Sequence, residues 1–133
     1  VMEVIKLVRD EFSIDNNRIY LWGHSMGGVG TYHIAAKHPE IFAGLGVAAP
    51  APEGNHDIMA TLEKIKHIPI FVLQGDEDGL VTRTREWVEK MEEIGMQHVY
   101  AEIPGGDHSL VISQDSEHMQ KFVDFFNIVR KKY

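Results

Sequence analysis

The sequence predicts an α/β fold with a parallel sheet, and two observations support this. Short apolar runs that suit buried strands alternate along the chain with longer segments of helical periodicity. The segments between the runs are too long for the tight turns of antiparallel hairpins, so each can hold a helix. With 133 residues, the chain is expected to form a single domain, residues 1–133, with helices on the faces of the sheet.

The first half of the chain predicts two helices and two strands. Before a polar stop, apolar residues recur at helical spacing: Val1, Val4, Ile5, Val8 and Phe12. The apolar run 19–22 predicts a buried strand. Helix-forming residues then occupy 27–37 until Pro39 closes the helix, and residues 44–49 predict a second buried strand.

The second half predicts two further strands and three helices. Residues 50–57, with two Pro, one Gly and one Asn, predict a loop before a short helix over 58–65. Strands are expected at 68–73 and 98–103. The helix between them ends at Gly95 and carries an apolar stripe made of Trp87, Met91 and Ile94. The last helix carries a similar stripe, made of His118, Phe122, Phe125, Phe126 and Val129.

The composition excludes several classes of function. The sequence has no Cys, so disulfides, thiolate zinc sites and cysteine nucleophiles are impossible. A balance of 13 Lys and Arg against 20 Asp and Glu argues against nucleic-acid or anionic membrane partners, because positive charge supplies most of that binding. No apolar run approaches the roughly 20 residues of a membrane span, and charged residues interrupt the first dozen positions. We therefore expect a cytoplasmic protein with a small, neutral ligand.

No metal ion or other cofactor is expected. The eight His include no His-x-x-x-His pair of a helical zinc site, since His33 and His38 are five residues apart. The run Asp76-Glu77-Asp78-Gly79 is similar to the start of a calcium loop. However, Leu80 and Arg83 stand where such a loop would need further oxygen ligands.

The strongest motif is Gly23-His24-Ser25-Met26-Gly27-Gly28, which lies between a predicted strand and a predicted helix. In this context Gly-x-Ser-x-Gly forms a sharp turn with a strained Ser backbone, and side chains at Gly23 or Gly27 would collide with neighbouring backbone. The turn exposes the Ser25 hydroxyl where the helix dipole and the N–H of Met26 can stabilise an oxyanion. His24 is expected to point away from that hydroxyl and to pack. The alternative is that Ser25 merely caps the helix.

A serine hydroxyl needs a base, and the base needs a carboxylate that orients it. Asp76 and Asp78 follow the third predicted strand, and His108 follows the fourth, in the chain order Ser, Asp, His. Because the carboxyl ends of parallel strands meet at one edge of a sheet, the three groups can converge there. The spacing alone leaves Asp76 and Asp78 both open as the acid.

These motifs resemble those of the α/β-hydrolase superfamily over nearly the whole chain. The stretch 15–39 is most similar to the feruloyl-esterase, polyester-depolymerase and prolyl-oligopeptidase-like branch. The resemblance implies Ser25 as nucleophile, Asp78 as acid and His108 as base. It favours Asp78 because the family's acid commonly stands three residues before a Val, here Val81; Asp76 is then expected to cap the loop.

The resemblance also implies a truncated α/β-hydrolase fold of about four parallel strands. The family's N-terminal strands, one of which usually precedes the second oxyanion N–H, have no counterpart here. Without them, the strand that begins with Ile19 and ends with Trp22 would have an unpaired edge, which predicts a homodimer through that edge. Only about nine residues separate the second strand from the next helix, so no lid domain is expected.

The expected function is hydrolysis of small carboxylic esters by a Ser-His-Asp mechanism with an acyl-enzyme intermediate. A serine peptidase or amidase of the prolyl-oligopeptidase-like branch is a rival, because that branch shares the motifs. A second rival is a catalytically weak half-domain that serves as a binding or oligomerisation module. Labelling of Ser25 by a fluorophosphonate would separate an enzyme from a binding module.

Overall fold

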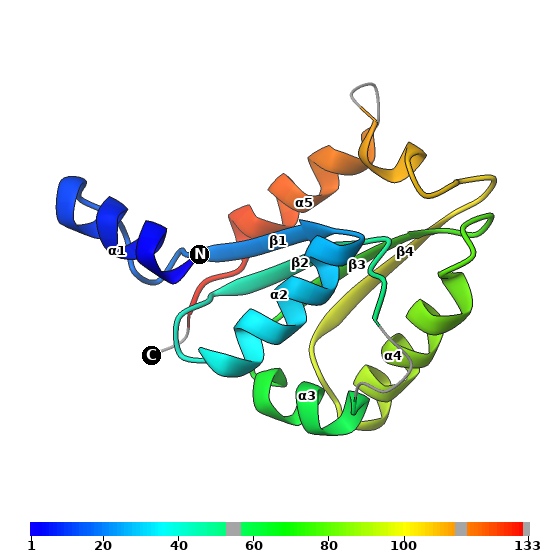
Figure 1. The fold of residues 1–133 in the computed structure, drawn as a ribbon, viewed down its shortest axis with the longest axis horizontal. Coiled ribbons are helices and arrows are strands. Elements are labelled where there is room, and N and C mark those ends of the chain that lie inside the picture. The colour runs from blue at the N-terminus through cyan, green and yellow to red at the C-terminus, as the bar shows by residue number, and fades with distance from the viewer. Residues whose placement is uncertain (53–56, 114–116, 132–133) are drawn as a thin grey trace.

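A computed structural model describes residues 1–52, 57–113 and 117–131. These residues form a parallel sheet in the order β1-β2-β3-β4, built from Tyr20–His24, Gly44–Ala48, Ile70–Gly75 and His98–Ile103. Figure 1 shows one face covered by α5 (Glu117–Ile128) and the other by α2 (Met26–Lys37), α3 (Ile58–Ile65) and α4 (Val81–Glu93). The predicted α/β class with four parallel strands is confirmed.

The two faces of the sheet belong to two cores, because successive side chains of a strand point to opposite faces. One core joins β2 and β3 to the α2–α4 side, and its strand residues are Leu45, Val47, Ile70 and Val72. The other core joins β3 to α5, and includes Phe71, Leu73, Phe122 and Phe125. Burial on both faces explains why these strands form continuous apolar runs rather than alternating patterns.

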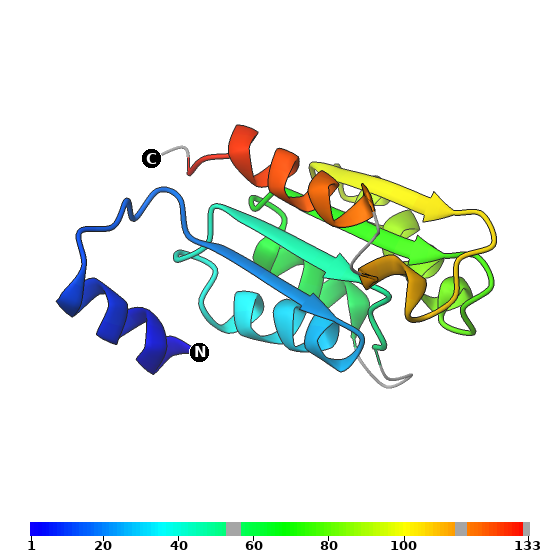
Figure 2. The same ribbon diagram turned by 90° about the horizontal axis from the view of Figure 1, so that it is seen from above.

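The carboxyl ends of all four strands lie along one edge of the sheet. The parallel register pairs His24 with Ala48 and Gly75 with Ile103, so the strands also end at similar heights. Figure 2 shows the four arrowheads pointing the same way. The loops that follow β1, β3 and β4 therefore start side by side, which is the arrangement the site requires.

Three strands differ from the predicted ranges. β1 spans Tyr20–His24 rather than 19–22, β2 ends at Ala48 rather than at residue 49, and β3 spans Ile70–Gly75 rather than 68–73. The third strand can include the polar Gln74 because its side-chain amide is hydrogen-bonded inside the protein, to Asp78 and to Thr84.

The helices agree with the predicted pattern except near the C-terminus. A short 3-10 helix, η1 (Leu110–Ile112), follows β4 and was missed by the sequence analysis. The final helix ends at Ile128, one residue before the predicted stripe residue Val129. Of the predicted loop 50–57, residues 53–56 lie outside the described residues. No helix in the described part of the chain is long and apolar enough to cross a membrane.

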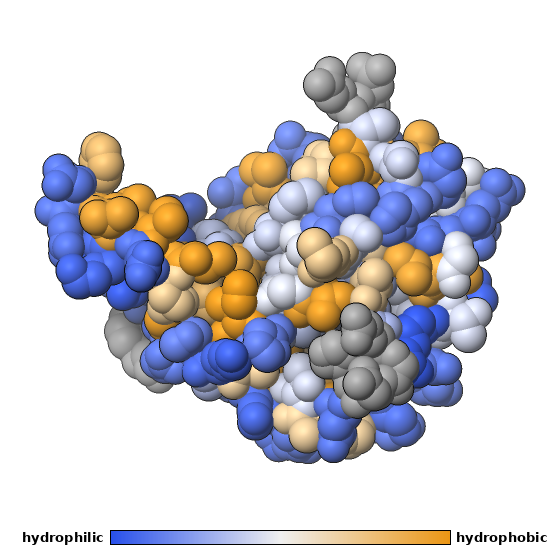
Figure 3. All heavy atoms as spheres, viewed as in Figure 1, coloured by the Kyte–Doolittle hydropathy of each residue, from blue (hydrophilic) through white to orange (hydrophobic). Residues whose placement is uncertain are grey.

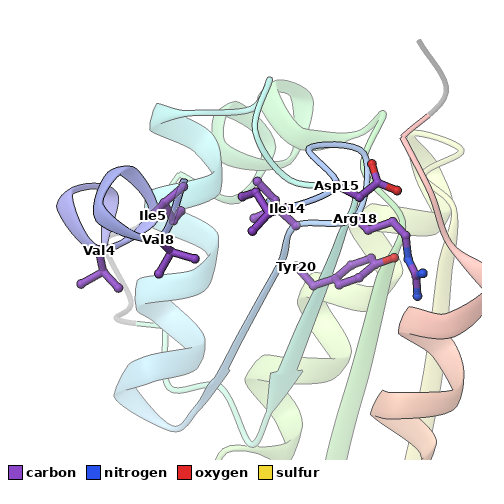
Figure 4. A pocket seen from close by; sticks show the side chains of 8 residues that line it. Val4, Ile5, Val8, Ile14, Asp15, Arg18 and Tyr20 are labelled. Carbon is purple, nitrogen blue, oxygen red and sulfur yellow. The ribbon is translucent and has the colours of Figure 1, made fainter. Parts of the chain in front are cut away.

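The first helix, α1 (Met2–Glu11), lies beside β1 rather than on the sheet (Figure 1) and has no buried residue. Val4, Leu7 and Val8 are exposed, whereas Ile5 is half-buried against the core. Figure 3 shows hydrophobic residues gathered around this end of the molecule. A hollow of about 400 Å³ separates α1 from β1, lined by Val4, Ile5, Val8 and Tyr20 among others (Figure 4). β1 pairs only with β2 among the described residues. Dimerisation through this edge stays a prediction.

Two buried or half-buried tyrosines give a matched test of the core. The hydroxyl of Tyr32 has no hydrogen-bond partner among the described residues, whereas that of Tyr20 donates to the carbonyl of Val129 at 2.7 Å. We expect Tyr32→Phe to raise the free energy of unfolding by about 1 kcal/mol and Tyr20→Phe to lower it by about 1 kcal/mol. Urea denaturation measures both changes. A loss of stability in Tyr32→Phe would contradict the assignment of an unpaired hydroxyl.

Candidate active site

Ser25 lies in the turn between β1 and α2, in a strained backbone conformation with φ 56° and ψ −119°. The strain predicted for this position is confirmed. The turn is held by backbone hydrogen bonds on both sides of Ser25. Its N–H donates to the carbonyl of Ala48 at 2.9 Å, and its carbonyl accepts from the N–H groups of Gly28 at 2.9 Å and Ala51 at 3.3 Å. The end of β2 and the loop after it therefore fix the position of the serine.

Glycine is sterically required at two positions of this turn, Gly23 and Gly28, and not at Gly27, where a collision was predicted. A Cβ on Gly23 would lie 2.1 Å from the carbonyl oxygen of Gly27, which confirms the predicted collision there. A Cβ on Gly27 would meet nothing within 4 Å, so the prediction for Gly27 is wrong. Gly27 brings its carbonyl toward β1, while its own Cα faces solvent. The second crowded position is Gly28, where a Cβ would lie 2.9 Å from the Cβ of Pro50.

The three residues predicted as a triad form one hydrogen-bonded chain. Ser25 Oγ lies 2.8 Å from His108 Nε2, and Asp78 Oδ2 lies 2.7 Å from His108 Nδ1. The groups follow β1, β4 and β3, so the shared strand edge brings them together. Asp76 does not take this place, because its Oδ1 accepts instead from the backbone N–H of Gly105 at 2.7 Å.

Asp78 is the buried end of this chain, with a side chain only 5% exposed. Burial raises the pKa of its carboxyl, but hydrogen bonds from His108 and from the backbone N–H of Leu80 outweigh burial and lower the pKa below its ordinary value. The side-chain amide of Gln74 adds to this lowering. The carboxylate is thus held ionised, the state that orients an imidazole.

Two glycines let the loops after β3 and β4 touch. A Cβ on Gly75 would lie 2.1 Å from the carbonyl oxygen of Gly106, and that carbonyl accepts from the N–H of Glu77 at 3.0 Å. This close approach places Asp78 and His108 within reach of each other. The predicted strand ended at residue 73, and nothing in the local pattern marked Gly75 as a contact between loops.

Asp107 shapes the other side of the same loop. Its Oδ1 accepts from the backbone N–H groups of Ser109 at 2.9 Å and Leu110 at 2.7 Å, and so starts the η1 turn. The bonds from Leu110 and Ser109 lower the pKa of the Asp107 carboxyl. His108 is therefore fixed between a side-chain turn on one side and the Gly75 contact on the other.

His24 belongs to the site, contrary to its predicted packing role away from it. Its Nε2 donates to the backbone carbonyl of His108 at 2.8 Å, and the two rings lie 4.8 Å apart. The side chains of β1 alternate between faces, and that of His24 shares the α5 face with Trp22, which packs on Phe122. The loop after β4 returns over this face, which the sequence alone did not reveal.

The residue after the serine, Met26, is the first residue of α2. The first N–H groups of a helix have no intrahelical acceptor, and the helix dipole makes this end electropositive. The predicted oxyanion donor thus stands at a helix N-terminus beside Ser25. Among the described residues, no cluster of three or more His, Cys, Asp or Glu could hold a metal ion.

With this geometry established, comparison with known proteins identifies the family. A family model described as a putative esterase matches residues 2–118. The chain belongs to this esterase family. Its fold is that of α/β-hydrolase esterases, which confirms the resemblance inferred from the Gly23–Gly28, Asp78 and His108 motifs.

Three relatives show how much of an esterase the chain represents. It is 31% identical over 81 residues to a bifunctional acetylxylan esterase/xylanase of Neocallimastix patriciarum. This match covers 61% of the chain and 11% of the relative. A thermostable esterase structure matches with a TM-score of 0.77 and 28% identity, covering 98% of the chain and 36% of the esterase. The fluorophosphonate-binding serine hydrolase F of Staphylococcus aureus matches with a TM-score of 0.73 and 18% identity, covering 94% and 61%. The chain spans less than two thirds of each relative.

The serine turn offers a matched pair of glycine substitutions. We expect Gly23→Ala to lower the free energy of unfolding by several kcal/mol, on the order of 2 to 4, because its Cβ would overlap backbone of Gly27. Gly27→Ala, with open space around its Cβ, should instead raise stability by up to about 1 kcal/mol through helix propensity. Chemical denaturation of both variants is the measurement. Equal destabilisation would show that both glycines are sterically required.

The lowered pKa of Asp78 predicts a pH-dependent contribution to stability. A carboxyl whose folded pKa lies below its unfolded value, here near 3.8, stabilises the fold above that value and loses this contribution as pH falls through the folded pKa. We expect the stability difference between wild type and Asp78→Asn to shrink between about pH 5 and pH 2. Urea denaturation across this range measures the difference. A gap that stays constant would contradict the lowered pKa.

Proposed function

We propose that the chain carries the catalytic part of a serine esterase. The observation that carries the proposal is the hydrogen-bonded chain from Ser25 Oγ through both ring nitrogens of His108 to Asp78 Oδ2. Such a chain gives a weakly nucleophilic hydroxyl a base and gives that base a fixed orientation. Membership of the esterase family supports the same chemistry.

In the proposed reaction, Ser25 Oγ attacks the ester carbonyl carbon while His108 Nε2 takes the hydroxyl proton. The tetrahedral intermediate collapses, and His108 returns the proton to the departing alcohol. Water then attacks the acyl-enzyme with His108 as base again, which releases the carboxylic acid and restores the hydroxyl. Asp78 remains ionised throughout and stabilises the imidazolium.

The oxyanion of both intermediates would lie against the N-terminus of α2, where Met26 supplies one backbone N–H. One such donor typically contributes about 2.7 to 4 kcal/mol to transition-state stabilisation, or 10² to 10³ in rate. The catalytic rate therefore depends strongly on how many donors reach the oxyanion. Esters need less of this stabilisation than amides, because an alkoxide leaves more readily than an amide anion, whose nitrogen must be protonated before it can leave.

The surroundings of Ser25 support a small acyl group as substrate. Met26 is 82% exposed, and His108 and Leu110 are also partly open to solvent. A site open to solvent cannot enclose a long acyl chain, whereas a short acyl ester needs little apolar enclosure. The relative whose name includes acetylxylan esterase makes acetyl esters the first substrates to assay.

The proposal is tested by covalent labelling and by turnover. A fluorophosphonate should label the wild type at Ser25, and p-nitrophenyl acetate should be hydrolysed. Ser25→Ala and His108→Ala should each lose turnover by about 10³-fold or more, since both remove part of one catalytic unit. Ser13→Ala, at an exposed serine outside the site, is the matched control and should retain activity.

Three outcomes would change the assignment. A folded wild type that neither labels nor hydrolyses the ester would reject the enzyme in favour of a binding module. Faster turnover of a p-nitroanilide than of the matching ester would favour the peptidase or amidase branch. Labelling at a serine other than Ser25 would remove the basis of the proposed mechanism.

A further inference from the structure

A chain of buried polar side chains continues behind the proposed triad. Gln74, on β3, and Thr84, on α4, are both completely buried. The Thr84 hydroxyl donates to Gln74 Oε1 at 2.7 Å, and Gln74 Nε2 donates to Asp78 Oδ2 at 3.0 Å. The same Nε2 also donates to the carbonyl of Gly75 at 3.1 Å. Every polar atom of the Gln74 side chain is therefore paired.

The amide of Gln74 faces Asp78 in the one orientation that attracts it. Turned by 180°, the amide would direct its oxygen at the carboxylate, and two acceptors would repel each other. The Thr84 hydroxyl selects the observed orientation, because it donates to the amide oxygen and so holds the NH₂ group toward Asp78. An apolar side chain at position 84 could not orient the amide in this way.

The two oxygens of Asp78 are held separately. Oδ1 accepts from the N–H of Leu80 at 3.0 Å, and Oδ2 accepts from Gln74 as well as from His108. The terminal torsion of an Asp side chain is broad and two-fold, so an unrestrained carboxylate can rotate. With one donor fixed on each oxygen, the carboxylate keeps Oδ2 toward the imidazole.

We propose that Gln74 and Thr84 are positioning residues for this site: Thr84 orients the Gln74 amide, and the amide holds the Asp78 carboxylate against His108. The inference rests on the esterase function proposed above. Neither side chain is placed to touch substrate, since both are buried on the far side of Asp78. Their loss should therefore lower kcat and leave KM unchanged.

Three variants separate positioning from a merely structural role. Gln74→Met and Thr84→Val each leave one polar group buried and unpaired, so both should reduce stability. The double variant replaces the pair by two apolar side chains, so much of that stability should return. Asp78 lacks the Gln74 donor in both Gln74→Met and the double variant. The kcat of each should therefore fall on the order of tenfold. A kcat that recovers together with stability would overturn the proposal.

Thr84→Ser is the conservative control, because it keeps the hydroxyl and loses only a methyl group. It should keep kcat close to the wild-type value, whereas Thr84→Val should lose several-fold of it. In the Gln74→Met background, Thr84→Val should cause no further loss of kcat, since Thr84 acts through the amide. Independent, multiplicative losses would contradict that order of action.

A readout that needs no turnover keeps this inference distinct from the proposed function. The Asp78 carboxyl can be titrated by ¹³C NMR in each variant. Loss of the Gln74 donor should move its titration to higher pH in Gln74→Met and in the double variant, with Thr84→Ser unchanged. An inactive wild type with this pattern would reject the esterase function and retain the positioning of Asp78. An unmoved titration in every variant would overturn the positioning role, whatever the activity.

Discussion

The parallel alignment of the four strands is the constraint on which the site depends. Ser25, Asp78 and His108 are separated by tens of residues, and each follows a different strand. In an antiparallel arrangement two of them would lie at opposite ends of the sheet. Here all strands end at one edge. Close backbone contacts then bring the loops after these strands together, and they are possible because positions 23 and 75 carry no Cβ. The hydrogen-bonded chain is thus a consequence of sheet direction plus two places without a Cβ.

The strained serine is balanced by the packing around it. A positive φ at a non-glycine residue costs of order 1 to 3 kcal/mol. Backbone hydrogen bonds offset this cost: Ser25 donates to Ala48 and accepts from Gly28 and Ala51. These partners come from β2, α2 and the loop after β2, so the turn is supported from three directions. The strain exposes the hydroxyl while keeping the N–H of the next residue at a helix terminus. Both features suit the nucleophile proposed above, which would face an oxyanion site.

Sequence reasoning predicted what local patterns encode and missed what contacts between distant segments decide. Apolar runs that alternate with helical segments along the chain predicted the four strands. The motifs that follow these runs indicated Ser25 and His108. Gln74 fell just outside the strand predicted at 68–73, because nothing local shows that a polar side chain will be paired inside the protein with a helix residue ten positions later. Gly27 was judged by its motif, although the face a helical Cα presents depends on packing. The contact between His24 and the carbonyl of His108 spans 84 residues and has no local signature.

The hydrogen-bonded chain from Thr84 to Ser25 runs from the interior to the surface. Burial decreases along it, so its inner and outer residues have different roles. The inner side chains are fully buried, where a hydrogen bond is strong and an unpaired polar group costs much stability. They therefore have one stable arrangement. The outer members are partly open to solvent, as the proposed deacylation step would require, because water would have to reach the carbonyl beside His108. A wholly buried triad would exclude that water, and a wholly exposed one would let the carboxylate turn to solvent. Rigidity therefore comes from β3 and α4, while access comes from the loops after β1 and β4.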